Sequence, residues 1–491
     1  MPAWFSLNDL YYLTPELMLA GAALVVLVLR AILPRDNQGI LSWFALAALV
    51  ATGAAVVTMT GTTPVSVSRG LIAVDSFAAF FKLLFLLAAA LTILMSTRYL
   101  EVEGASPGEY VFLVLCATLG MMFMAGGTDL ISIFVGLETM AIAFYILTGM
   151  LKPNRRSNEA AVKYFILGTF SLGLLLYGMS LMYGFTGTTN LRAIAVALAS
   201  QGRDGWLVLA VVMIVAGVGF KIAAVPFHMW APDVYEGAPT PITAFLSVGS
   251  KAASFSMLLR ILVEGLPAAS ADWTLLLYVL SVLTMTVGNI AALTQSNIKR
   301  MLAYSSIAHA GYVLIGVIAG TPRGIASTLI YLMVYAFMQM GAFAVVVMMR
   351  RADAIGDELK DLSGLFSRQP GAALGMLVFM LSLGGIPPTA GFMGKFWLFS
   401  AAIDANYVWL AVIGVLNSVV SIYYYLRVVV FMFMKSEATG SEPAIGPALT
   451  AALAVGVVGT LVLGVYPRPL FELAEVSART LGVVGIPATP F

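Results

Sequence analysis

The sequence has little charge for its length. Of its 491 residues, 10% are Asp, Glu, Lys or Arg, and 60% are hydrophobic. Soluble globular chains carry roughly 25% charged residues, so this chain lacks the polar side chains that would cover a water-facing surface. We therefore expect an integral membrane protein whose outer surface faces lipid.

Cysteine and histidine are also scarce, which limits the chemistry of the chain. Cys116 is the one cysteine, and this excludes an intrachain disulfide, an iron–sulfur cluster and a thiolate zinc site. Two histidines, His228 and His309, are too few to favour a haem or a histidine-rich metal centre. Because no dense basic run occurs, no nucleic-acid partner is expected. We expect neither a cofactor nor a metal ion in this chain.

Apolar segments follow one another along the whole sequence. About fourteen of them reach the roughly 20 residues that a membrane-spanning helix needs. This predicts an all-α polytopic membrane protein with a single membrane domain over residues 1–491. The amphipathic tail 469–484 is expected to lie at the membrane interface. The segments lie near residues 14–33, 40–60, 71–96, 109–125, 130–150, 160–184, 206–225, 240–263, 273–294, 300–319, 324–349, 371–403, 406–434 and 446–465.

Basic residues in the loops predict the orientation of these helices. Lysine and arginine at loops and helix ends are more frequent after odd-numbered segments than after even-numbered ones. The positive-inside rule therefore places the odd-numbered side in the cytoplasm. With an even number of helices, both termini are then expected to be periplasmic.

Five lysines lie inside the apolar segments: Lys82, Lys163, Lys221, Lys251 and Lys395. A charged side chain at the centre of a spanning helix costs about 2.5–3.5 kcal/mol on insertion scales, so an unpaired one is rarely kept for packing alone. Ionisable residues at this depth are typical of a proton path.

The depth of these groups differs. With a rise of about 1.5 Å per residue, Lys251 lies roughly 15 Å into a helix that begins at Pro241. Glu138 lies roughly 12 Å into a helix that begins near Leu130. Both are therefore predicted to lie near the middle of the bilayer.

Two of the lysines accompany breaks in their helices. Lys221 shortly precedes Pro226, which removes a backbone donor and ends a helix, and Lys395 follows a Gly-Gly pair and a Pro-Pro pair that ends at Pro388. Interrupted segments at matching positions of two halves indicate an inverted-repeat transporter and mark its ion site.

These positions suggest distinct roles in proton transfer. Burial favours the neutral form of a lysine, whereas a neighbouring carboxylate favours the charged form. Glu138 is therefore expected to modulate Lys221, because neutralising or moving the carboxylate lets the lysine release its proton. Lys251 is expected to be the central relay, and Lys395 the group nearest an exit.

Structural roles compete with these interpretations. Lys251 and Lys395 would then snorkel or pair structurally, which their depth disfavours, and two other lysines would form local pairs. Lys163 is able to pair with Glu159 at i,i+4 near the cytoplasmic end of its helix. Lys82 and Asp75 are i,i+7 on one helix face, and we expect them to form a structural pair.

The remaining polar groups at depth also have two interpretations. His309 lies about 15 Å into its helix, where it acts either as a relay or as a satisfied core histidine. His228 follows the Pro226 break and either relays protons or caps the broken end. A stripe of Tyr331, Tyr335 and Gln339 either holds water or makes helix–helix hydrogen bonds.

Four sequence runs carry a family likeness. They are FVGLETMAIAFYIL (134–147), KIAAVPFHMWAPDVYEGAPTPITAFLSVGSKAASF (221–255), SNIKRMLAYSSIAHAGYVLIG (296–316) and LSLGGIPPTAGFMGKFWLF (381–399). Together they closely resemble the antiporter-like subunits of respiratory complex I, the proton-pumping NADH–quinone oxidoreductase. Lysine at position 395 after GIPPTAGF resembles the N type rather than the M type. The end of the chain soon after a fourteenth helix disfavours the L type.

The resemblance implies a fold and a set of site residues. It implies two inverted five-helix repeats, 107–265 and 272–435, each with a broken helix. It implies a localisation in the bacterial cell inner membrane, beside a neighbouring antiporter-like subunit and small membrane subunits. FMN, iron–sulfur clusters and quinone are then expected in partner subunits. The implied proton relay consists of Glu138, Lys163, Lys221, Lys251, His309 and Lys395, supported by His228, Lys299, Pro226 and Pro388.

Other functions remain open at this point. A subunit of a multi-subunit cation/proton antiporter is the main alternative. A solute transporter is disfavoured because the deep groups are mainly ionisable, and a purely structural spacer does not account for several charges at mid-bilayer depth.

Overall fold

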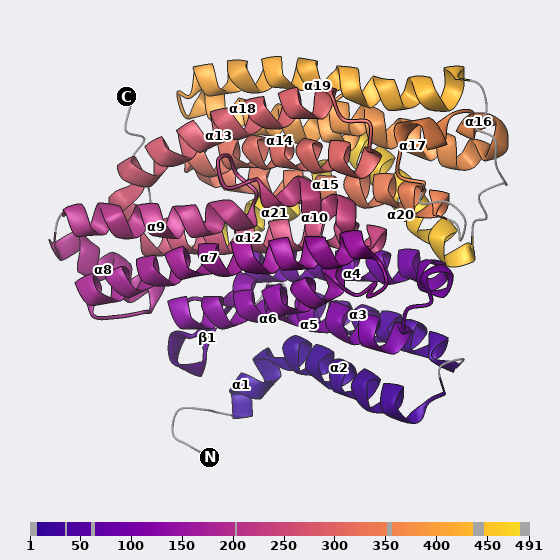
Figure 1. The fold of residues 1–491 in the computed structure, drawn as a ribbon. Coiled ribbons are helices and arrows are strands. Elements are labelled where there is room, and N and C mark those ends of the chain that lie inside the picture. Colours follow the sequence, from indigo (N-terminus) through magenta and orange to yellow (C-terminus); the bar gives the residue numbers. More distant parts are fainter. Residues whose placement is uncertain are drawn as a thin grey trace.

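The computed structural model describes residues 7–34, 37–59, 64–201, 204–350, 356–435 and 446–481. Over these residues the chain forms a bundle of helices, most of which run side by side from α2 at one edge to α19 at the other (Figure 1). The strands β1 (Val65–Val67) and β2 (Ile72–Val74) form a short antiparallel hairpin. The predicted all-α membrane fold class is confirmed.

Twelve helical segments of the described chain are long and apolar enough to cross a membrane. Three of them, α14, α15 and Thr240–Gly265, are almost wholly buried within the bundle. The twelve are α2 (Thr14–Ile32), α3 (Gly39–Met59), α4 (Ser76–Glu103), α5 (Pro107–Gly126), α6 (Leu130–Thr148), α7 (Arg155–Thr186), Thr240–Gly265, Pro267–Leu293, α14 (Ile298–Ala319), α15 (Pro322–Met349), α19 (Val408–Met434) and α20 (Pro447–Val465).

Two further apolar segments are interrupted, as their prolines predict. The first consists of α9 (Gly205–Lys221) and α10 (Trp230–Gly237), and the second of α17 (Pro370–Gly384) and α18 (Ala390–Asp404). Each interruption contains a cis prolyl peptide, at Pro226 and at Pro388. If each interrupted segment crosses once, the described chain matches the fourteen crossings expected, but that number stays a prediction.

The segment that carries Lys251 alternates between helix types. It consists of α11 (Thr240–Phe245), the π-helix η3 (Leu246–Ser250), α12 (Lys251–Leu259) and a second π-helix, η4 (Arg260–Gly265). Lys251 follows η3 directly. Because π-helical turns are rare and often occur at functional sites, this placement singles out Lys251 within its helix.

Two helices that line the candidate site, α6 and α14, begin at local capping residues. The side chain of Asp129 accepts a hydrogen bond from Ile131 N (2.8 Å) at the start of α6. Asn297 does the same for Arg300 N (3.1 Å) at the start of α14. Each cap satisfies one of the backbone N–H groups left unpaired at a helix start, and so fixes where the helix begins.

The same packing arrangement occurs in both predicted repeats. α5 packs along α6, and α13 (Ser270–Leu293) packs along α14. A Cβ atom on Gly120 would lie 2.5 Å from Met140 N, and one on Gly288 would lie 2.7 Å from Ala308 N. Glycine thus permits close backbone contact in both pairs. The inverted relation of 107–265 to 272–435 stays a prediction.

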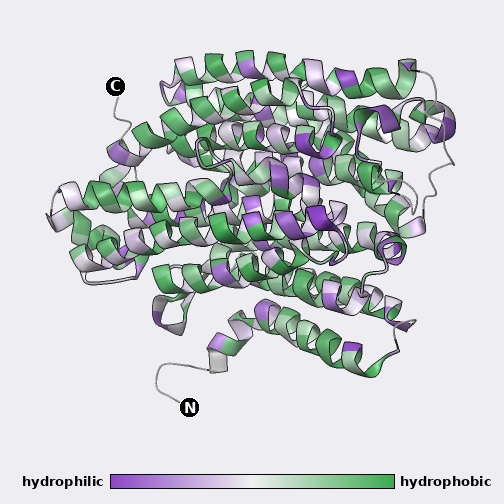
Figure 2. Ribbon diagram, viewed as in Figure 1, coloured by the Kyte–Doolittle hydropathy of each residue, from purple (hydrophilic) through white to green (hydrophobic). Residues whose placement is uncertain are grey.

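Outer helices present apolar side chains, whereas hydrophilic residues are sparse along them (Figure 2). Leu24 on α2, Val50 on α3 and Leu416 on α19 are all exposed. This is the surface that lipid or another apolar protein surface would cover.

Short elements complete the described chain, and α21 follows the last long helix. Of the predicted tail 469–484, residues 482–484 lie outside the described part. α21 packs against α4 and α15, and Thr480 Oγ1 accepts a hydrogen bond from Phe77 N (3.1 Å). The short elements are α1 (Leu7–Tyr12), η2 (Ser68–Gly70), α8 (Leu191–Gln201), η5 (Pro267–Ala269), η6 (Leu359–Leu362), α16 (Leu365–Arg368) and α21 (Arg468–Thr480).

Candidate functional site

Three of the predicted lysines lie deep inside the bundle. Lys221 is the last residue of α9, Lys251 the first of α12, and Lys395 lies in the middle of α18. Each is 3% exposed. Two of the three therefore belong to the interrupted segments, and the third to the helix with π-helical turns.

Lys221 is close to Glu138 without forming a contact ion pair with it. Lys221 Nζ lies 3.4 Å from the hydroxyl of Tyr145 and 5.5 Å from the centre of its ring. Glu138 lies two turns before Tyr145 on α6, and its charge interacts with that of Lys221. Glu138 Oε1 is buried and makes no hydrogen bond within the described chain. Glu138 and Lys221 thus lie near each other and interact through their charges, but they do not form a direct salt bridge.

Lys251 is joined to α14. Its ammonium donates to the carbonyl and to the hydroxyl of Ser306, both at 2.5 Å. Ser306 precedes His309 by three residues, so the two side chains lie on the same side of α14. The ammonium of Lys251 therefore contacts α14 about one turn before His309.

His309 links two tyrosines from different helices. Its Nδ1 lies 2.6 Å from the hydroxyl of Tyr331 on α15, and its Nε2 lies 3.0 Å from that of Tyr425 on α19. Tyr331 thus makes the helix–helix hydrogen bond that its stripe predicts. Tyr335 Oη and both polar atoms of the Gln339 side chain are buried and make no hydrogen bond within the described residues.

Lys395 is held by the break between α17 and α18. Its ammonium donates to Leu383 O (3.0 Å), Gly384 O (3.3 Å) and Ser418 Oγ (2.8 Å). The last carbonyls of a helix have no partner within it and carry partial negative charge. The end of α17 therefore supplies acceptors for Lys395, and the Tyr312 ring centre lies 5.0 Å from its Nζ.

Two predicted supporting residues, His228 and Lys299, take no part in the contacts described above. His228 is half-buried between α9 and α10, and its Nδ1 is buried without a hydrogen-bond partner among the described residues. Lys299 donates to Glu236 O and Ala238 O, both at 2.7 Å. Lys299 therefore caps the C-terminal end of the half-helix α10.

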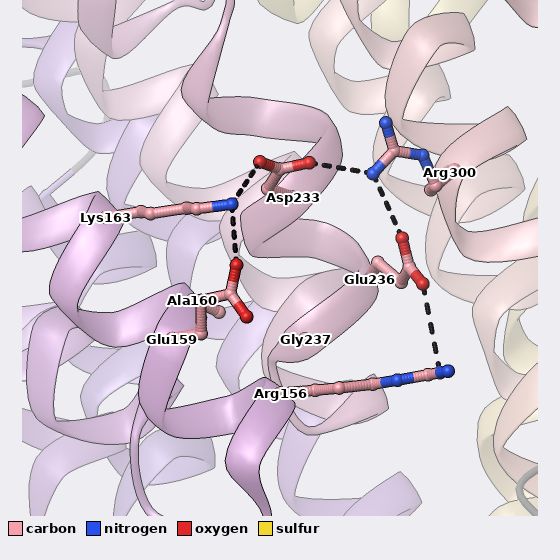
Figure 3. A pocket seen from close by; sticks show the side chains of 8 residues that line it. All are labelled: Arg156, Glu159, Ala160, Lys163, Asp233, Glu236, Gly237 and Arg300. Carbon is pink, nitrogen blue, oxygen red and sulfur yellow. Dashed lines mark hydrogen bonds and ion pairs between the residues drawn. The ribbon is translucent and has the colours of Figure 1, made fainter.

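Lys163 belongs to a charged pocket of about 250 Å³ between α7, α10 and α14 (Figure 3). Its ammonium lies between Glu159 (2.8 Å) and Asp233 (2.7 Å), which confirms the expected i,i+4 pair and adds a second carboxylate. Arg300 bonds to Asp233 (2.8 Å) and to Glu236 (3.0 Å). Alternating charges thus join the three helices.

Asp233 is the centre of this pocket, and sequence reasoning did not single it out. Lys163 and Arg300 contact the two different oxygens of its carboxylate. The available signal was an acidic residue within an otherwise apolar run just after the Pro226 break.

The expected pair of Lys82 and Asp75 is wrong. Lys82 pairs with Glu16 on α2 (2.6 Å), and both side chains are buried. Asp75 caps α4 by accepting from Ala78 N (2.8 Å), so its short side chain lies at the helix end. Two helical turns, about 11 Å, separate it from Lys82, which is too far for a direct bond.

Asp75 instead binds a buried arginine. Arg260 is 0% exposed and contacts Asp75 (2.9 Å), Glu264 (2.8 Å) and Ala125 O (3.0 Å). Sequence reasoning did not single out Arg260 as a buried group. Its i,i+4 spacing to Glu264 within an apolar run was the signal for a buried pair.

Comparison with known proteins gives concordant results. Residues 127–421 match the family described as NADH:quinone oxidoreductase/Mrp antiporter, TM. NADH-quinone oxidoreductase subunit N of Trichlorobacter lovleyi is 47% identical over 480 residues, which cover 97% of this chain and 98% of the relative.

Solved structures show the same likeness. A chain of respiratory complex I from Thermus thermophilus with bound aureothin has a TM-score of 0.80 and 35% identity, and the match covers 94% of this chain and 99% of that chain. A chain of the Mrp complex from Dietzia sp. has a TM-score of 0.84 and 25% identity, with 97% and 98% covered.

Proposed function

The chain belongs to the membrane family described as NADH:quinone oxidoreductase/Mrp antiporter, and on this premise we propose that it moves protons across the membrane as the antiporter-like N subunit of respiratory complex I. The similarity to a relative of that name over nearly the full length of both chains supports this assignment. The placement of charge inside the bundle supports proton transfer.

The observation that carries the proposal is the burial of Lys221, Lys251 and Lys395. Each is 3% exposed, and none forms an ion pair with a carboxylate of the described chain. A charge at this depth is costly, and a nearby partner for every charge would be expected if packing were its only purpose. Lysines held by carbonyls, hydroxyls and tyrosine rings are instead able to exist in both protonation states.

The contacts around Lys251 and His309 suggest an order for the central part of the path. The proton on Lys251 passes to the hydroxyl of Ser306, which gives up its own proton, and the neutral amine left on Lys251 is reprotonated from the opposite side. No hydrogen bond joins Ser306 to His309 in the described chain, so transfer between them requires bridging water; the two nitrogens of His309 then face the hydroxyls of Tyr331 and Tyr425. The proposed path then continues to Lys395, which lies beside the break between α17 and α18.

The first part of the path includes Glu138 and Lys221. In the proposed cycle Glu138 stabilises the ammonium of Lys221, and its protonation or displacement releases that proton. Lys221 and Lys251 share no direct contact in the described chain, so transfer between them requires bridging water or a shift of a half-helix. We assign Lys163 and the charged pocket to proton uptake, with Lys299 and Pro226 positioning α10 and Pro388 positioning α18. His228 remains a supporting candidate.

The energy for transport comes from partner subunits in this proposal. Moving one charge across the membrane takes about 2.3 kcal/mol per 100 mV, and a conformational change coupled to electron transfer from NADH to quinone supplies it. The chain is then a non-redox subunit of a translocase. FMN, iron–sulfur clusters and quinone belong to partner subunits, and a neighbouring antiporter-like subunit and small membrane subunits flank it. We place it in a bacterial inner membrane with both termini periplasmic.

The test uses the assembled complex in proteoliposomes. Lys251→Ala and Glu138→Ala should each lower proton pumping and the NADH oxidation coupled to it. Lys251→Arg is the matched control for charge. Unchanged proton uptake in both alanine variants would contradict the proposal.

The alternative is a subunit of a cation/proton antiporter, which the similarity to the Mrp complex chain favours. Co-purification separates the two functions. Flavin and iron–sulfur absorbance in the purified native assembly would accompany a complex I subunit and would be missing from an antiporter.

A further inference from the structure

Lys395 lies over a tyrosine ring, whereas Lys221 lies at the hydroxyl end of one. Lys395 Nζ lies 5.0 Å from the ring centre of Tyr312 on α14. Lys221 Nζ lies 5.5 Å from the ring centre of Tyr145 on α6 but 3.4 Å from its hydroxyl, so it lies toward the edge of that ring. The contact with a ring face is therefore specific to the second interrupted segment.

The contact is electrostatic. The face of an aromatic ring carries partial negative charge and attracts a cation whose distance from the ring centre is within about 6 Å, most strongly where water is excluded. Both lysines are 3% exposed. Lys395 has only carbonyl and hydroxyl oxygens as hydrogen-bond partners, and no described carboxylate forms an ion pair with it. Lys221 has the carboxylate of Glu138 nearby, whereas no described carboxylate forms an ion pair with Lys395 beside the Tyr312 ring.

The ring of Tyr312 is held in place from its hydroxyl end. Asn289 Nδ2 donates to Tyr312 Oη (3.1 Å) and to Met285 O (2.9 Å), and Asn289 Oδ1 accepts from Tyr424 Oη (2.9 Å). Because the carbonyl oxygen of Met285 only accepts hydrogen bonds, the amide atom of Asn289 that contacts it is the nitrogen. Asn289 is 0% exposed. The same ring meets the His309 ring edge-on, at 5.7 Å and 76°.

We propose that Tyr312 is a positioning residue that stabilises the ammonium form of Lys395 through its ring face, and that Asn289 fixes the Tyr312 ring for this purpose. The inference rests on the proposed proton-transfer function. It identifies the Tyr312 ring as a group that stabilises the protonated form of Lys395 between proton transfers.

Position 312 separates the effect of the ring from that of the hydroxyl. The hydroxyl of Tyr145 lies 3.4 Å from Lys221, so a change there alters a hydrogen bond as well as the ring. The hydroxyl of Tyr312 is bonded to Asn289 instead. Replacing Tyr312 by phenylalanine therefore keeps the ring over Lys395 and removes only its tether.

The experiment replaces Tyr312 in the assembled complex with phenylalanine and then with mono-, di- and trifluorinated phenylalanine. Fluorine withdraws charge from the ring face with little change in size, so folding is preserved across the series. Proton pumping per NADH oxidised is measured in proteoliposomes from pH 6 to pH 9. A weaker ring contact lets the lysine lose its proton at lower pH. The alkaline limb of the profile should therefore move to lower pH with each fluorine.

Tyr312→Leu removes the ring and should give the largest displacement, about 0.4–1.5 pH units. Asn289→Leu should move the limb in the same direction by less. Identical profiles for phenylalanine and its trifluorinated form would overturn the inference, whether or not the leucine variant assembles. Tyr278→Leu is the control, because this half-buried tyrosine packs near the tilted ring of Tyr407 and faces no cation in the described chain.

Lys395→Ala separates the two proposals. If pumping persists in Lys395→Ala, the proposed path through the second half is wrong, whatever the ring variants show. If pumping is lost in Lys395→Ala while the fluorinated variants leave the pH profile of pumping unchanged, only the proposed role of the ring is wrong.

Discussion

Lys163 Nζ lies 2.7 Å from Asp233 Oδ2, and this contact ties α7 to the half-helix α10 (Figure 3). The half-helix is short, so it depends on side-chain contacts for its position. Arg300 holds the other oxygen of Asp233 at 2.8 Å. One carboxylate thus connects α10 to two long helices at the surface of the bundle.

Asp233→Asn should therefore slow proton uptake more than it lowers stability. Partly exposed ion pairs contribute about 1 kcal/mol or less, so the thermal midpoint of the complex should change little. Pumping by the assembled complex in proteoliposomes gives the activity, and differential scanning calorimetry gives the stability. Glu159→Gln, which removes the more exposed partner of Lys163, is the control and should have the smaller effect.

Lys82 should matter for stability and not for pumping. Removing one partner of a buried ion pair leaves an unpaired charge and costs about 3–5 kcal/mol, so Lys82→Met should lower the thermal stability strongly. Combining Lys82→Met with Glu16→Gln removes both charges and should restore most of it. The double variant should pump normally per NADH oxidised. A double variant that assembles but does not pump would place Lys82 in the proton path.

Arg260 should be more sensitive than any exposed arginine. Arg260→Met leaves Asp75 and Glu264 buried without their cation, which should cost about 3–5 kcal/mol. Arg260→Lys should recover only part of the loss, because an ammonium lacks the planar fork that reaches three acceptors. The matched control is Arg323→Met, whose pair with Asp404 is half-exposed and contributes about 1 kcal/mol or less. Thermal unfolding of the purified complex compares them.

Local sequence was sufficient to place the lysines and the breaks. A lysine in an apolar run is easy to recognise because its free-energy cost in lipid is large. Pro226 and Pro388 interrupt their helices locally, whatever the tertiary structure around them. The family resemblance supported the same relay residues, whose roles stay a prediction. Lys221, Lys251 and Lys395 are buried as their segments predict.

Partners distant in sequence were not predictable in the same way. Asp75 and Arg260 are 185 residues apart, and nothing in either segment specifies the other. The i,i+7 pairing of Asp75 with Lys82 failed because a capping aspartate turns toward the helix start. Tyr312 looked like an ordinary aromatic core residue, since only the packed structure shows which ring faces a cation.

His309 provides the last prediction, because two tyrosines contact its two ring nitrogens. A neutral imidazole donates from one nitrogen and accepts at the other, so it is able to pass a proton between Tyr331 and Tyr425 by exchanging its tautomer. A positioned acid–base group typically contributes a factor of about 10²–10⁴ to proton transfer. His309→Gln should therefore slow pumping at least tenfold, since glutamine forms hydrogen bonds but does not exchange protons in this way. Tyr425→Phe, which leaves Nε2 without its partner, should give a smaller loss of the same kind, and Tyr407→Phe should give none. Normal pumping in His309→Gln would make this histidine a packing residue and move the path to another side chain near Ser306.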